Sequence, residues 1–148
     1  TIRYGNGGGK TSEDQIGFCG NDSGSLTGAS YRWDNVSWTS SGTVPYGNRN
    51  IGGDSNEDCS KALTAGGYTN DSYSATLDDT TWTQENDIST DRNFPSAMYL
   101  ADDSLWCWGG LGTSWEDSGE FLDGSGGTWA SASGTLNTAQ GYGQGCAS

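Results

Sequence analysis

The chain has 148 residues, enough for one domain, and its 19 acidic against 6 basic residues give a formal net charge of -13. A field of this sign repels phosphate backbones, so we expect no nucleic-acid partner. The apolar runs are only a few residues long, so we expect no membrane insertion. The 25 glycines and 7 tryptophans, together with abundant serine and threonine, are typical of strands and turns and predict an all-β fold.

The first glycine-rich stretch, GNGGGKT at residues 5–11, is similar to a phosphate-binding loop. Its spacing does not fit, because that pattern requires glycine where Tyr4 stands. The residues after Lys10 also lack the 3.6-residue apolar period of the helix that must follow such a loop. We therefore expect a turn between two strands here.

The chain has four cysteines: Cys19, Cys59, Cys107 and Cys146. They lack the CxxC or CxxH spacing of a zinc site, and the chain has no histidine. Two disulfides are their simplest use. Three sequons, which begin at Asn21, Asn35 and Asn70, are potential glycan acceptors. Together with a first residue, Thr1, that suggests a processed mature chain, these features predict a secreted, extracellular protein.

The chain contains an internal repeat with a period of about 45 residues. Three segments share a bulky residue, an aspartate, a polar turn and a tryptophan: YRWDNVSWTS (31–40), ATLDDTTWTQ (75–84) and EFLDGSGGTWAS (120–131). Their tryptophans, Trp38, Trp82 and Trp129, lie 44 and 47 residues apart. We expect all three to occupy equivalent environments.

Two further landmarks recur with these tryptophans. A polar anchor follows each tryptophan by ten or eleven residues, and an arginine stands in the same place at the start of the chain: Arg49, Arg92, Gln140 and Arg3. A glycine follows each arginine by seventeen or eighteen residues: Gly20 alone, then the pairs Gly66-Gly67 and Gly109-Gly110. The order of landmarks therefore covers nearly the whole chain.

This order resembles the kelch repeat of β-propellers, in the Gly/Thr/Trp-rich form of secreted and viral proteins. In that family each repeat is a four-stranded antiparallel blade, and the double glycine ends the second strand. The resemblance implies three blades, about 1–44, 45–88 and 89–134, with residues 135–148 as one strand of a fourth unit. It also places the glycines of GNGGGK on a crowded inner strand. The single Gly20 and the substitution of Gln140 for arginine depart from the pattern.

Placing the cysteines on these repeats favours one of the three possible disulfide connectivities. Cys19 and Cys107 fall on second strands, whereas Cys59 and Cys146 fall in the first-strand region of the following repeat. We expect Cys19–Cys59 and Cys107–Cys146 bonds, each tying one blade to its neighbour.

A propeller normally needs at least four blades, so three blades and one strand leave sheet faces and edges open. Two chains forming a six-bladed ring, a head-to-tail array, or a longer protein containing this chain would each supply the missing neighbour. We expect assembly, with other copies of the chain as partners. The predicted function is a secreted, non-enzymatic structural subunit of an oligomer or filament.

Carbohydrate binding is the alternative function, as an adhesin or a viral fibre module. Trp106, Trp108 and Trp115 are additional to the repeat and lie close to Glu116 and Asp117, which suits stacking on a sugar and bonding its hydroxyls. Assigning Trp106 and Trp108 to opposite faces of one strand predicts that one of them packs in the core or at an interface.

Enzymatic chemistry and metal binding have weaker support in the sequence. Without histidine the common nucleophilic arrangements are absent, but a glycosidase needs only two carboxylates. The candidates for such a pair are Asp78, Asp79, Asp102, Asp103, Glu116, Asp117 and Glu120. We expect no enzyme and no required cofactor. Oxygen ligands suit calcium, so Asp22, Asp71 and Asp117, which follow each glycine landmark, are candidate calcium ligands.

Overall fold

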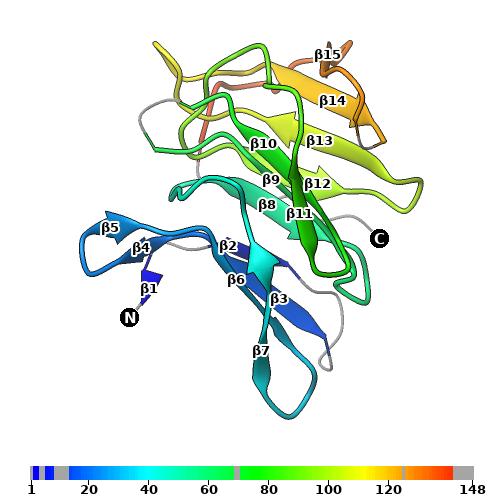
Figure 1. Ribbon diagram of the computed structural model, residues 1–148. Coiled ribbons are helices and arrows are strands. Elements are labelled where there is room, and N and C mark those ends of the chain that lie inside the picture. Colours follow the sequence, from blue (N-terminus) through cyan, green and yellow to red (C-terminus); the bar gives the residue numbers. More distant parts are fainter. Residues whose placement is uncertain (1, 4–5, 9–13, 69–70, 125, 142–148) are drawn as a thin grey trace.

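The computed structural model describes residues 2–3, 6–8, 14–68, 71–124 and 126–141. Every regular element in these residues is a β-strand, and the strands form four antiparallel sheets (Figure 1). The predicted all-β fold is therefore confirmed. None of the described residues belongs to a helix long and apolar enough to cross a membrane.

Three of the sheets have four strands each, arranged in the order of the chain, and only in the first do two strands of the small sheet, β4 and β5, intervene between neighbours. The first sheet contains β2 (Asn6–Gly8), β3 (Gln15–Phe18), β6 (Ala29–Trp33) and β7 (Trp38–Thr43). The second contains β8 (Gly52–Ser55), β9 (Lys61–Ala65), β10 (Ser74–Asp78) and β11 (Thr81–Gln84). The third contains β12 (Ser96–Tyr99), β13 (Ser104–Trp108), β14 (Gly119–Asp123) and β15 (Ala130–Ser131). A small fourth sheet pairs β1 (Ile2–Arg3), β4 (Asn21–Asp22) and β5 (Ser25–Leu26).

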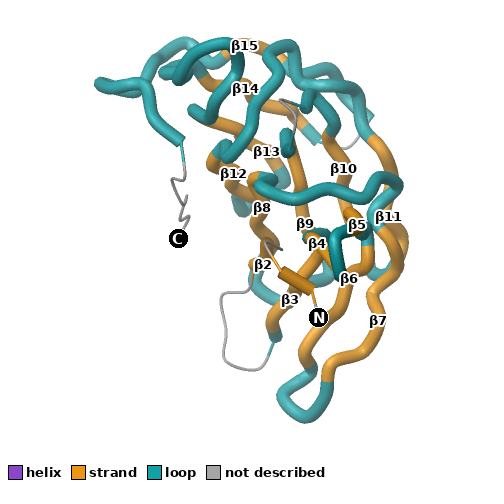
Figure 2. Tube along the Cα trace, turned by 90° about the vertical axis from the view of Figure 1, so that its left-hand side faces the viewer, coloured by secondary structure: helices purple, strands orange, loops and turns teal. Residues whose placement is uncertain are grey.

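The three large sheets are stacked in chain order, and their first strands β2, β8 and β12 lie side by side (Figures 1 and 2). Small residues make this approach possible. A β-carbon on Gly8 would lie 2.6 Å from the backbone nitrogen of Ser55, and one on Gly52 would lie 3.0 Å from the β-carbon of Ala97. Residues 6–8 of the glycine-rich stretch therefore form a crowded strand, β2, and the rest of that stretch lies outside the described residues.

Two apolar cores hold the stack together. We call the face of a sheet that is turned toward the preceding sheet its leading face, and the opposite face its trailing face. In the first sheet, the trailing face is the one turned toward the second sheet, and the leading face is the opposite one. The first core joins Ile16 and Phe18, on the trailing face of the first sheet, to the leading face of the second. The second core joins Leu63 and Ala65, on the trailing face of the second sheet, to the leading face of the third. Alternate residues of β9 thus enter different cores, because successive side chains of a strand point to opposite faces.

The glycine landmarks are positions where the backbone has a positive φ at the end of the second strand of each sheet. The three pairs are Cys19-Gly20, Gly66-Gly67 and Gly109-Gly110, whose first residues have φ of 56°, 68° and 63°. Cys19 therefore stands where the other two sheets have the first glycine. This residue adopts the left-handed conformation despite its side chain, at a cost of about 1–2 kcal/mol.

Each landmark is bonded to an anchor that begins the next repeat. The N–H of the second landmark residue donates to the anchor carbonyl, in the pairs Gly20 with Asn48, Gly67 with Arg92 and Gly110 with Gln140, at 2.6, 2.7 and 2.8 Å. The prediction of Arg49 as the anchor was wrong by one residue. The carbonyl that accepts from Gly20 and the buried side chain that contacts Gly66 both belong to Asn48. The side chains of Asn48 and Arg92 then donate to the carbonyls of Gly66 and Gly109, at 3.3 and 2.7 Å. An anchor therefore links two successive sheets.

Within the described residues the large sheets form an open stack and no closed ring. The leading face of the first sheet and the trailing face of the third are each left uncovered by another sheet of this part of the chain. The predicted additional strand is not seen in residues 135–141, which contain no strand, and residues 142–148 lie outside the described residues.

The expected Cys19–Cys59 disulfide is not formed, and Cys19, Cys59 and Cys107 are buried free thiols. Cys19 follows the end of β3, whereas Cys59 lies in the turn beside Asp58, whose carbonyl accepts from Arg32 near the beginning of β3. Four strand residues span about 13 Å, and a disulfide requires Cα atoms within about 7 Å. The other expected partner, Cys146, lies outside the described residues.

We expect these three thiols to resist modification in the folded protein. Burial raises the pKa of the Cys19 and Cys107 thiols to about 12 and also raises that of Cys59, so little reactive thiolate forms near neutral pH. In a Cys146→Ser variant, Ellman's reagent should detect no reactive thiol in the native protein and three thiols per chain in denaturant. A single thiol in denaturant would instead show that two of the three cysteines are disulfide-bonded.

Candidate functional site

The trailing face of the third sheet carries an aromatic surface. Along β13, Leu105 and Cys107 enter the second core, whereas Trp106 and Trp108 point together to the opposite side. The assignment of these two tryptophans to opposite faces was wrong, because residues two apart on a strand share a face. Both are therefore available to the same ligand or partner.

The two tryptophan rings form an ordered ladder. They lie parallel, with an interplanar angle of 1° and centroids 5.8 Å apart, and Trp106 also stacks on Phe121 of β14 at 5.1 Å. The indole N–H of Trp106 donates to the Ser104 hydroxyl at 3.2 Å. The Trp108 ring lies over Gly119, where any β-carbon would collide with it. The orientation of the ladder is thus fixed by its own sheet.

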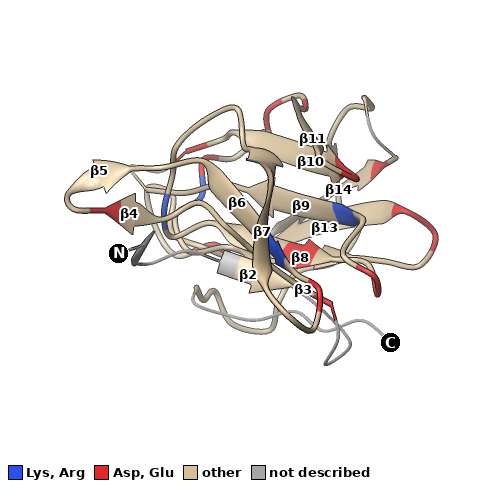
Figure 3. Cartoon of the chain, turned by 60° about the horizontal axis from the view of Figure 1, so that its bottom comes forward, with Lys and Arg blue, Asp and Glu red and all other residues tan. Residues whose placement is uncertain are grey.

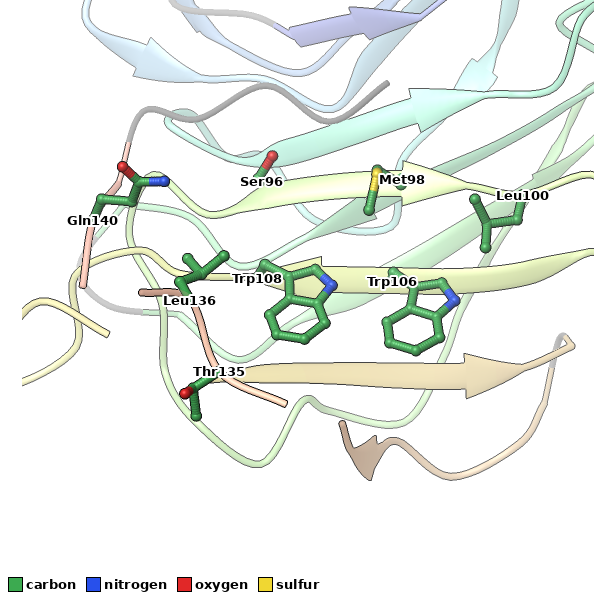
Figure 4. A pocket seen from close by; sticks show the side chains of 8 residues that line it. All are labelled: Ser96, Met98, Leu100, Trp106, Trp108, Thr135, Leu136 and Gln140. Carbon is green, nitrogen blue, oxygen red and sulfur yellow. The ribbon is translucent and has the colours of Figure 1, made fainter. Parts of the chain in front are cut away.

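A cavity of about 520 Å³ opens over this ladder (Figure 4). Its walls come from β12 and the residue after it, from β13 and from the segment after β15: Ser96, Met98, Leu100, Trp106, Trp108, Thr135, Leu136 and Gln140. Met98 lies opposite Trp106 on the neighbouring strand, and Ser96 lies opposite Trp108. Most of the wall is apolar, with three short polar groups at its edges.

The remaining predicted carbohydrate-binding residues do not line this cavity. Trp115 is exposed in the loop after β13, where its ring lies against the backbone of Gly141. Glu116 and Asp117 accept backbone hydrogen bonds from Gln140 and Leu136 through their own carbonyls. The loop therefore supports the segment that forms one wall, and sequence reasoning missed Met98 and Leu136, which carry no polar or repeat signal.

The leading face of the first sheet is the second aromatic surface, at the other end of the stack. Tyr31 and Trp33 alternate along β6, and Trp33 faces Trp38 of β7 with ring centroids 5.8 Å apart. Tyr31 and Trp38 are exposed. Sequence reasoning marked only Trp38, although the two-residue alternation in YRW is the signal that places Tyr31 and Trp33 on one face.

The three repeat tryptophans do not share one environment, which corrects the expectation. Trp82 is 8% exposed and Trp129 is 6% exposed, because each packs against the trailing face of the preceding sheet. Trp38 is 52% exposed, since no preceding sheet is present in the described residues. The position in the repeat is the same, and the neighbour is what differs.

The predicted calcium ligands are dispersed. Asp71 accepts from the Asn48 side chain at 3.1 Å, and burial raises the pKa of its carboxyl. Asp22 accepts from the Ser23 hydroxyl in the small sheet, and Asp117 lies in the loop after β13. Among the described residues, no group of three or more acidic or cysteine side chains is placed to hold a metal ion.

Two of the three sequon asparagines lie in described residues. Asn35 is exposed in the turn between β6 and β7, with a positive φ of 68°. Asn21 is part of β4, and its side-chain oxygen accepts from the N–H of Gly24 at 2.9 Å. Asn70 lies outside the described residues.

The candidate catalytic residue Glu120 and the repeat aspartate Asp34 both have structural partners. Glu120 is buried, accepts from the N–H groups of Ser89 and Thr90, and forms an ion pair with Arg92 at 3.3 Å. Asp34 caps its turn, and the N–H groups of Ser37 and Val36 lower the pKa of its carboxyl.

Comparisons with known proteins give no family. No protein-family model and no curated protein matches the chain. The features of the molecule that bear on function are the two aromatic faces and the cavity over Trp106 and Trp108.

Proposed function

We propose that this protein is a non-enzymatic structural module that assembles through the two ends of its sheet stack. The observation that carries the proposal is that both end sheets expose ordered aromatic residues on the faces that, between sheets, form the cores. Tyr31, Trp33 and Trp38 occupy one end, and Trp106 and Trp108 the other. Burying such faces against another sheet stabilises at about 25 cal/mol per Å² of apolar area.

The kelch-like interpretation of the repeat supports this proposal. Each four-stranded sheet then corresponds to one blade, and a chain with three blades requires neighbours to complete a ring or extend an array. We further propose an extracellular location, which the sequon at the exposed Asn35 supports.

The strong negative charge sets a condition for assembly. Acidic residues are distributed over many of the turns between strands (Figure 3), and the net charge of -13 makes copies repel one another. The Debye length falls from about 30 Å at 0.01 M salt to about 10 Å at 0.1 M. Assembly should therefore strengthen as salt is added, the opposite of an association driven by ion pairs.

Sedimentation velocity over a range of protein and salt concentrations tests the proposal. We expect monomers in dilute, low-salt solution and larger species when concentration and salt rise. A single monomeric species up to millimolar protein in 0.5 M salt would contradict the proposed function.

Carbohydrate binding is a second candidate, favoured by the parallel rings of Trp106 and Trp108 under an open cavity. Aromatic faces of this kind pack against the apolar face of a sugar, and Ser96, Thr135 and Gln140 offer polar groups at the edges. Glycan-array binding by the monomer that is lost on Trp106→Ala would support it, and the absence of any signal would remove it.

A further inference from the structure

We infer that the leading face of one copy docks on the trailing face of a second copy of the same chain, with Trp38 entering the cavity over Trp106 and Trp108. This inference rests on the proposed assembly and names its contact. The two sheet interfaces within the chain provide the pattern for this contact.

The first internal interface shows the arrangement. Trp82, on the last strand of the second sheet, packs edge-on against Phe18 of the first sheet, with ring centroids 5.2 Å apart. It also lies beside Gly42 of β7. A leading-face tryptophan thus covers the second strand of the preceding sheet.

The second internal interface repeats it. Trp129 is buried in the core that contains Leu63 and Ala65 of β9, and its indole N–H donates to the Ser74 hydroxyl of β10 at 3.0 Å. The tryptophan just before β15 therefore packs on the second sheet as Trp82 packs on the first. Two of the three repeat tryptophans follow one rule.

The register of the repeat shows where the third tryptophan would pack. Phe18, Ala65 and Trp108 each stand directly before a landmark pair, on the trailing face of the second strand. Ile16, Leu63 and Trp106 occupy the corresponding positions two residues earlier. By this correspondence, Trp38 of one copy would pack against Trp108 on the third sheet of another copy.

The chemistry of the cavity suits this occupant. Its volume of about 520 Å³ is large enough for an indole, and its wall of Met98, Leu100, Leu136 and two tryptophans is apolar. The two internal trailing faces are closed by tryptophan, whereas no tryptophan from a following sheet closes this one among the described residues. The docking face, on the first sheet, differs from the receiving face, on the third sheet, and each copy has one of each. Repeating the contact therefore produces a closed ring or an open filament, depending on the rotation between copies.

Variants at the two faces test the inference by sedimentation velocity in 0.5 M salt. Trp38→Ala removes the docking side chain, and Ser96→Arg places a charge in the cavity wall. Each should weaken self-association at least about 30-fold, the effect of losing an interface anchor worth about 2 kcal/mol. Leu26→Ala, which removes an exposed apolar side chain of the small sheet outside both docking faces, is the control and should associate as the wild type does.

Mixing gives the decisive result. Trp38→Ala retains the cavity and Ser96→Arg retains Trp38, so an equimolar mixture should form a two-copy species that neither variant forms alone. Monomers in the mixture, or wild-type association by Trp38→Ala, would overturn the inference. A wild type that never associates would instead contradict the proposed function itself, which keeps the two failures distinct.

Discussion

Replacing Arg92 with alanine should lower the free energy of unfolding by about 3–5 kcal/mol, the largest effect that we expect from a single charged residue. The Arg92 side chain is fully buried and donates to the Gly109 and Ser118 carbonyls at 2.7 and 3.0 Å. It also donates to the Ser118 hydroxyl at 2.9 Å and pairs with Glu120. Its loss leaves the Glu120 carboxylate buried without its cation and removes a link between the second and third sheets.

Urea unfolding followed by tryptophan fluorescence measures this change. Arg92→Ala/Glu120→Gln should recover part of the loss, since the unpaired charge is then removed. Arg49→Ala is the control: this guanidinium stacks on the Tyr68 ring at 3.8 Å, and its removal should cost about 1 kcal/mol or less. Equal losses for Arg92→Ala and Arg49→Ala would show that the buried network does not hold the sheets together.

The same substitution at the three repeat tryptophans should have unequal effects. Trp82→Ala and Trp129→Ala should each lower the free energy of unfolding by about 3–5 kcal/mol, because each empties a core between two sheets. Trp38→Ala should cost about 1 kcal/mol, the value of its aromatic contact with Trp33.

These losses are to be measured in dilute, low-salt solution, where we expect the protein to be monomeric. Under associating conditions the wild type should gain stability with protein concentration, and Trp38→Ala should not, because binding that occurs only in the folded state raises its apparent stability. If Trp38→Ala destabilises the monomer as strongly as Trp82→Ala does, then Trp38 is buried and the first sheet has no open leading face.

The repeat was readable from the sequence because its landmarks obey local rules. A positive φ at the end of each second strand favours glycine, and Gly66 and Gly109 show this in sequence alone. The corresponding position in the first sheet is Cys19, which the sequence does not mark as a positive-φ residue. Its φ of 56° is seen only in the folded backbone. The anchor at Asn48 was missed for a related reason: the adjacent Arg49 matched the motif, and the contact to Gly66 is a long-range one.

By itself the sequence determined the fold class, the period of the repeat and the placement of glycine and aspartate in turns, since composition and local backbone preference suffice for these. Only the tertiary structure decided which tryptophans are buried, that Cys59 lies in a turn near the beginning of β3 whereas Cys19 follows its end, and that Trp106 and Trp108 share one face. The burial of a tryptophan depends on whether a neighbouring sheet covers it and not on the residue type. Between two sheets, the covering residues are distant in the chain. At both ends of the stack, no covering sheet is present among the described residues.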